Sequence, residues 1–86
     1  MNQILDQKLE KIKNWIFLKR PNIENFNNDY DIIGNKVLNS LHFMEFIYLI
    51  EELSENEIDV SELNFTDFST INKIKENFFS HILINN

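Results

Sequence analysis

Residues 39–53 read NSLHFMEFIYLIEEL, an almost uninterrupted apolar run with acidic residues near its end. The apolar positions that form one broad helical face are Leu41, Met44, Phe46, Ile47, Ile50 and Leu53. Asn39 and Ser40 both suit the N-cap, because their side-chain oxygens can accept hydrogen bonds from the unpaired amides of a first turn. The run therefore predicts a helix that starts at Asn39 or Ser40. Such an apolar helix must be largely buried or must leave an exposed patch for a partner.

A first helix is predicted upstream of this run. Its apolar residues recur at helical spacing and are Leu5, Leu9, Ile12 and Ile16, with Trp15 beside them. Lys19 and Arg20 suit the C-terminal end of the helix dipole. Pro21 ends the helix, because the residue before a proline is pushed out of the α region.

Residues 21–39 form a connector rich in Asn and Asp, which favour turns. An unstructured loop of this length is unusual in a small domain. Six apolar residues can hold the connector against the core: Phe26, Tyr30, Ile32, Ile33, Val37 and Leu38. Gly34 is expected to supply a backbone turn within it.

Two further elements are predicted after the apolar run. Ser61 is expected to cap one short helical turn that continues through Leu63 and Phe65. Ser69 or Thr70 is expected to cap a last helix, whose apolar face is Ile71, Ile74, Phe78 and Ile82, with Phe79 alongside. Residues 1–86 therefore predict a single all-α domain, a small four-helix bundle of three main helices and one short helix with a long first loop.

The composition excludes several classes of protein. The chain has no Cys, which rules out disulfides and thiolate metal sites, and its two His residues are far apart in sequence, so no metal site is expected. The single Gly and single Pro argue against a turn-rich β fold. No apolar run reaches the roughly 18 residues that span a bilayer, so no membrane contact is expected. No continuous apolar signal core is present at the N-terminus, and a cytoplasmic protein is expected.

Charge is divided unevenly along the chain. Residues 1–20 hold five Lys or Arg and two acidic residues, a net charge of +3, whereas residues 21–86 hold three Lys and twelve acidic residues, a net charge of −9. An acidic body repels phosphate backbones and makes nucleic acid an unsuitable partner. It would attract a basic protein partner. An equally ordinary interpretation is that acidic side chains keep a small domain soluble.

Two blocks of sequence stand out together. The first is Val37-Leu38-Asn39-Ser40-Leu41, followed by Met44-Glu45-Phe46, Ile50-Glu51-Glu52 and Glu57-Ile58, and the second is LNFTDFSTI at residues 63–71. Together they resemble the acyl carrier protein family, and the second block is similar to the approach to the last helix in stand-alone carriers. The resemblance extends from about residue 5 to residue 79, and it implies an acyl-carrier-protein-like bundle that acts as a monomer.

The resemblance also implies a cofactor site. Ser40 matches the serine that receives a covalent 4′-phosphopantetheine arm from coenzyme A, whose thiol then carries an acyl or aminoacyl group as a thioester. The implied partners are a phosphopantetheinyl transferase, a loading ligase and downstream synthases or transferases of fatty-acid or specialised-metabolite biosynthesis. Residues that match partner-binding positions are Asn39, Leu41, Met44, Glu45, Glu51 and Glu52. Asn39 departs from the family, which usually has Asp there.

Two other functions stay open at this stage. A small helical protein–protein interaction module, with Ser40 only an N-cap, would explain the apolar stripes and the caps. An enzyme is the weakest alternative, because the chain has no Gly-rich phosphate loop and no Cys. We therefore expect no catalytic activity from this protein itself. The cargo within the carrier class stays open.

Overall fold

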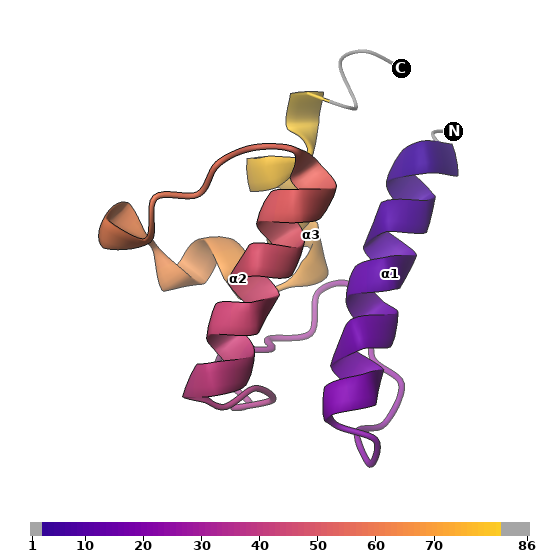
Figure 1. Ribbon diagram of the computed structural model, residues 1–86. Coiled ribbons are helices and arrows are strands. Elements are labelled where there is room, and N and C mark those ends of the chain that lie inside the picture. Colours follow the sequence, from indigo (N-terminus) through magenta and orange to yellow (C-terminus); the bar gives the residue numbers. More distant parts are fainter. Residues whose placement is uncertain (1–2, 82–86) are drawn as a thin grey trace.

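The structure is a computed structural model that describes residues 3–81, and within that range it is all-helical, with no strand (Figure 1). Three α-helices, α1 (Gln3–Lys19), α2 (Ser40–Ser54) and α3 (Ile71–Phe78), are joined by a long connector and by two short 3-10 turns. These turns are η1 (Val60–Glu62) and η2 (Phe65–Phe68). The three predicted main helices are thus confirmed. None of the helices in the described part of the chain is long and apolar enough to cross a membrane.

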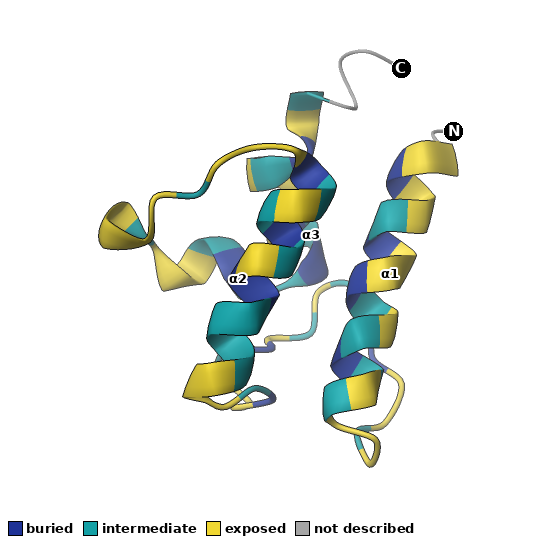
Figure 2. Cartoon of the chain, viewed as in Figure 1, coloured by how far each residue is buried: buried dark blue, intermediate teal, exposed yellow. Residues whose placement is uncertain are grey.

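Helices α1 and α2 lie side by side and run in opposite directions (Figure 1). The buried residues of α1 are the four that the spacing predicted: Leu5, Leu9, Ile12 and Ile16. They pack with Phe46, Ile47 and Ile50 of α2 and with Ile71 and Ile74 of α3 in one core, as Figure 2 shows by the buried faces that the helices turn inward. Trp15 stacks on Phe46 with 5.5 Å between ring centroids, so aromatic contact adds to the burial of apolar area.

The connector is held against the core as predicted. Phe26, Ile32 and Val37 are buried, while Tyr30, Ile33 and Leu38 are half-buried. Backbone hydrogen bonds also join it to the start of α3: the Ile32 N–H donates to Ser69 O at 2.7 Å, and the Asn72 N–H donates to Asn28 O at 3.0 Å. A long loop can stay ordered here because apolar side chains and the backbone both anchor it.

The segment between α2 and α3 differs from the prediction. Two separate 3-10 turns replace one short helix, and Asp59 and Asn64 cap them in place of Ser61. Asp59 accepts hydrogen bonds from both the N–H and the hydroxyl of Ser61, at 3.0 and 2.6 Å. The Ser61 hydroxyl is therefore a donor to the cap and does not form it. For α3, the predicted cap at Thr70 is confirmed, since its hydroxyl accepts from the Lys73 N–H at 2.9 Å.

The predicted turn at Gly34 is confirmed. The Gly34 N–H donates to the Asp31 carboxylate at 2.7 Å, and a Cβ at residue 34 would collide with that carboxylate. The left-handed backbone of the connector lies at Lys36, with φ of 52°. Helix α3 ends at Phe78, and the following Phe79 is fully buried. Ile82 lies outside the described residues.

Candidate functional site

Ser40 is the first residue of α2 and is exposed. The N-cap is Asn39, whose Oδ1 accepts from the His42 N–H at 2.8 Å. This corrects the alternative in which Ser40 serves only as the cap. Within residues 3–81 no hydrogen bond engages the Ser40 hydroxyl. The Ser40 hydroxyl is therefore exposed at the N-terminus of α2, and it makes no hydrogen bond within residues 3–81 that would stabilise the helix.

The segment that precedes Ser40 is held by Arg20 and by the burial of Val37. Val37 is buried, and its carbonyl accepts a hydrogen bond from Arg20 Nη1 at 2.6 Å. The same Arg20 nitrogen reaches the Lys36 carbonyl at 3.1 Å. Arg20 directly follows α1, so the end of one helix holds the approach to the next. The position of Ser40 therefore depends on the packing of α1 as well as on α2.

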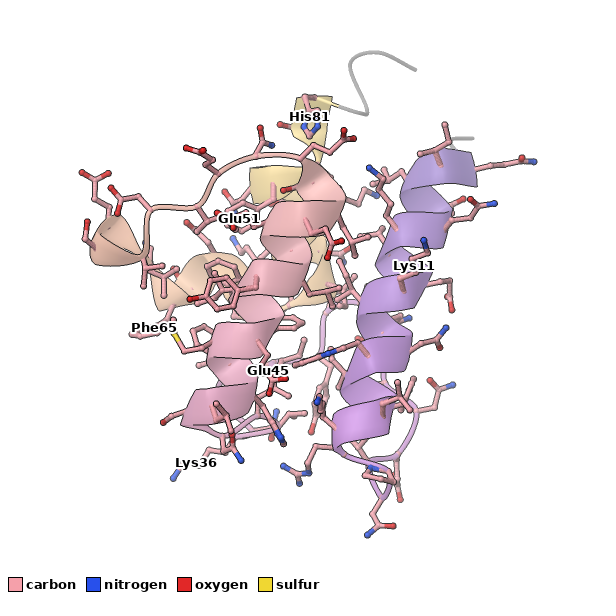
Figure 3. All side chains as sticks on the ribbon, in the orientation of Figure 1. Lys11, Lys36, Glu45, Glu51, Phe65 and His81 are labelled. Atoms are coloured by element: carbon pink, nitrogen blue, oxygen red, sulfur yellow. The ribbon has the colours of Figure 1, made fainter. Side chains whose placement is uncertain are left out.

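An apolar pocket of about 660 Å³ opens beside Ser40. Its polar lining comes from Ser40, Asn39 and Lys36. Figure 3 shows Lys36 near the start of α2. Its apolar lining includes Ile32, Leu38, Phe43, Met44, Leu63 and Phe65. Phe65 and Phe43 lie 5.4 Å apart between ring centroids, which joins η2 to α2 across the pocket wall. An apolar group tethered near Ser40 could be shielded from water there.

Sequence reasoning missed most of this pocket. Met44 was placed among the partner-binding residues, and the structure shows it half-buried against the core and lining the pocket. Ile32 was predicted only to hold the connector against the core, and Phe65 was predicted only as part of a short helical turn. They come from opposite sides of α2 in the sequence, and no local pattern indicates that they meet.

Helix α2 exposes a narrow apolar ridge. Leu41 is 69% exposed and Tyr48 is 56% exposed, and their spacing of seven residues puts them on one line along the helix. Leu41 was a predicted contact residue, whereas Tyr48 was missed although the spacing could have found it. Large apolar side chains left in water on one line are the kind of feature that a partner covers.

The three predicted acids of α2 have different surroundings. Glu45 forms an ion pair with Lys19 of α1 at 3.4 Å. The Glu51 carboxylate accepts a hydrogen bond from the Ile58 N–H at 2.8 Å, which holds the chain that follows α2. Glu52 is exposed, and within residues 3–81 it has no hydrogen bond or ion pair. Figure 3 shows Glu45 on the side of α2 that faces α1 and Phe65 on the opposite side.

More acidic side chains gather beyond α2, around a second hollow of about 310 Å³. Its charged lining residues are Glu57, Asp59, Glu62 and Asp67. Hydrogen bonds from the Ser61 hydroxyl and the Ser61 N–H lower the pKa of Asp59 below its usual value. No group of three or more His, Asp or Glu in the described part of the chain could hold a metal ion.

No protein-family model, curated protein or solved structure matches this chain.

Proposed function

We propose that this protein is an acyl carrier protein, with an acyl-carrier-protein-like bundle, which bears 4′-phosphopantetheine on Ser40 and carries acyl or aminoacyl groups to partner enzymes. The observation that supports this most directly is the exposed Ser40 hydroxyl beside an apolar pocket. Because Asn39 caps α2, the Ser40 hydroxyl is not the capping group. A serine with no structural task at a helix N-terminus suits covalent attachment.

The attachment chemistry fits this position. In the transferase reaction the Ser40 oxygen would form a bond to the β-phosphorus of coenzyme A. The pyrophosphate P–O bond breaks, adenosine 3′,5′-bisphosphate leaves, and a base on the transferase takes the serine proton. The new phosphodiester carries one negative charge, which the N-terminal end of the α2 dipole favours. Lys36, which lines the same pocket, adds a positive charge nearby.

The surroundings of Ser40 also suit the later steps. The apolar pocket can take an apolar group on the arm, while the ridge formed by Leu41 and Tyr48 and the exposed Glu52 offer contacts to a partner. Basic patches on such a partner would be attracted by the acidic body of the chain. Partner enzymes would perform the chemistry on the thioester, and this protein would position it.

Intact-mass measurement tests the proposal. The purified protein is incubated with coenzyme A and a broad-specificity phosphopantetheinyl transferase, alongside an established carrier protein as a positive control. We expect one phosphopantetheine on the wild type and none on Ser40→Ala. If the control carrier is modified and this chain is not, the carrier function is wrong. If Ser54, Ser61, Ser69 or Ser80 is modified instead, the assignment of Ser40 is wrong.

A helical interaction module is the second candidate. The exposed Leu41, Tyr48 and Phe65 favour it, because they could form a binding surface without any cofactor. Failure of Ser40 modification would favour this candidate over the carrier.

A further inference from the structure

Lys19 and Glu45 connect the two longest helices at a point five residues beyond Ser40. Their Nζ and Oε2 atoms are 3.4 Å apart, and the side chains are 31% and 42% exposed. Lys19 Nζ also lies 5.5 Å from the centroid of the Trp15 ring. Trp15 in turn stacks on the buried Phe46. The lysine is therefore held by a fixed aromatic ring as well as by the carboxylate, unlike most surface ion pairs.

The Lys19–Glu45 ion pair changes which acidic side chains of α2 are available to a docking partner. Glu51 is engaged by the Ile58 N–H, and Glu45 is engaged by Lys19, so Glu52 alone among these three acids is without a partner in residues 3–81. A basic side chain that approaches Glu45 must share this carboxylate with Lys19 or displace it. The positive charge of Lys19 also repels a basic patch as it approaches.

We propose that Lys19 is an intramolecular competitor for Glu45, which slows the docking of basic partner enzymes beside Ser40. The inference rests on the proposed carrier function. It gives α1 a role in partner selection. A partner with a weakly basic patch docks slowly, whereas a partner that can displace Lys19 or contact Glu52 docks faster. Removal of the lysine therefore strengthens docking, although it removes a contact within the fold.

The test measures the initial rate of Ser40 modification under kcat/KM conditions with a broad-specificity phosphopantetheinyl transferase and coenzyme A. Lys19→Met is compared with Lys11→Met, which makes the same charge change on the same helix. Lys11 is exposed and has no ion pair within residues 3–81. Both substitutions retain an unbranched stem, and thermal unfolding verifies that each variant is folded at the assay temperature.

We expect Lys19→Met to be modified about two- to fivefold faster than Lys11→Met at low salt, in keeping with the energies of exposed ion pairs. The difference should shrink at 1 M salt, where the Debye length is about 3 Å. In a Glu45→Gln background, the difference between Lys19→Met and Lys11→Met should be smaller, because competition for the Glu45 carboxylate is already removed and only repulsion by Lys19 remains.

In protein that retains Glu45, modification of Lys19→Met that is equal to or slower than that of Lys11→Met overturns the competitor role. Modification of the wild type would still support the carrier function. If the wild type is not modified and an established carrier is, both proposals fail together.

Discussion

Arg20 Nη1 donates a hydrogen bond of 2.6 Å to the carbonyl of Val37, three residues before Ser40. Through this bond the end of α1 fixes the segment that leads into α2. Lys36, which adopts a left-handed backbone with φ of 52°, is held by the same guanidinium at 3.1 Å. An unfavourable backbone conformation persists where neighbouring groups stabilise it. Arg20 is one of the groups that stabilise this conformation at Lys36.

The first prediction is that Arg20→Met destabilises the fold. Hydrogen bonds from charged donors contribute about 1.5–3 kcal/mol where they are shielded. Arg20 is exposed, so we expect a loss of about 1–2 kcal/mol in the free energy of unfolding, measured by urea denaturation. Arg20→Lys should recover part of this loss, because an ammonium can donate to the same carbonyls but lacks the planar geometry of the guanidinium. A cost for Arg20→Met no larger than that for Lys11→Met would show that the contact to Val37 contributes nothing.

The second prediction separates Asn39 from Ser40. Asn39→Ala should lower the free energy of unfolding by about 1 kcal/mol, because it removes the N-cap of α2. Ser40→Ala should change it by less than about 0.5 kcal/mol, since its hydroxyl holds nothing in the fold. Both values come from urea denaturation of the unmodified protein. A larger cost for Ser40→Ala than for Asn39→Ala would contradict the assignment of the cap.

Asn39→Asp extends this prediction to the cofactor site. Aspartate keeps the capping oxygen and adds a negative charge at the helix N-terminus, which is worth about 0.3–1 kcal/mol of stability. It also restores the acid that the carrier family usually has before its serine. We expect faster modification of Ser40 by a transferase that prefers Asp, followed by intact mass. Equal rates for both forms with several transferases would mean that the departure at Asn39 has no effect on modification.

The parts of the fold that could be predicted from the sequence are those that local sequence patterns determine. Helix α1 was found from four apolar residues at helical spacing and from Pro21, and α2 from Asn39 and the apolar run, all of which are local signals. The turns at residues 59–68 were misassigned because Asp59 and Asn64 bond to the backbone two residues on and outcompete a regular helix. A hydrogen bond from one side chain to the nearby backbone leaves no periodic pattern in the sequence.

The candidate site was predictable only in part for a related reason. Ser40 and Leu41 are local features and were identified. The pocket is lined by both Ile32 and Phe65, which come from segments on either side of α2 in the sequence, and the Glu51 carboxylate accepts a hydrogen bond from the N–H of Ile58, seven residues later. These contacts depend on tertiary packing, so spacing along the sequence does not reveal them.

The third prediction concerns acid and η1. Hydrogen bonds from Ser61 lower the pKa of Asp59 from its usual value near 3.8. A group with a lowered folded-state pKa contributes stability that is present above the unfolded pKa and is lost as the pH falls through the folded pKa. The thermal midpoint of the wild type should therefore exceed that of Asp59→Ala near pH 6, and the gap should narrow below about pH 4. A gap that widens toward acid pH would contradict this role for the Asp59 carboxylate.

The fourth prediction assigns different roles to the adjacent acids Glu51 and Glu52. Glu51→Ala leaves the Ile58 N–H without its carboxylate acceptor, so we expect a loss of about 1–2 kcal/mol in the free energy of unfolding. Glu52→Lys should leave that free energy within about 0.5 kcal/mol and instead slow Ser40 modification in a salt-dependent way. Urea denaturation and modification rates are measured on both variants. The assignment fails if Glu52→Lys destabilises the fold or leaves modification unchanged.

The fifth prediction concerns the wall of the pocket beside Ser40. Phe65 is 58% exposed, and its ring lies 5.4 Å from that of Phe43. An apolar acyl group on the arm that enters this pocket would gain about 25 cal/mol for each Å² of apolar area removed from water, and the Phe65 side chain supplies part of that area. Phe65→Ala should weaken this shielding, while its exposure keeps the cost to stability small.

We therefore expect an octanoyl thioester on Phe65→Ala to hydrolyse about two- to fivefold faster than on the wild type, which corresponds to about 0.4–1 kcal/mol of lost apolar contact. Tyr48→Ala is the matched control, because Tyr48 is 56% exposed and lies outside the pocket. An acetyl thioester, too short to bury much area, should hydrolyse at the same rate on all three proteins. Equal octanoyl hydrolysis on Phe65→Ala and Tyr48→Ala would mean that the pocket does not hold the cargo.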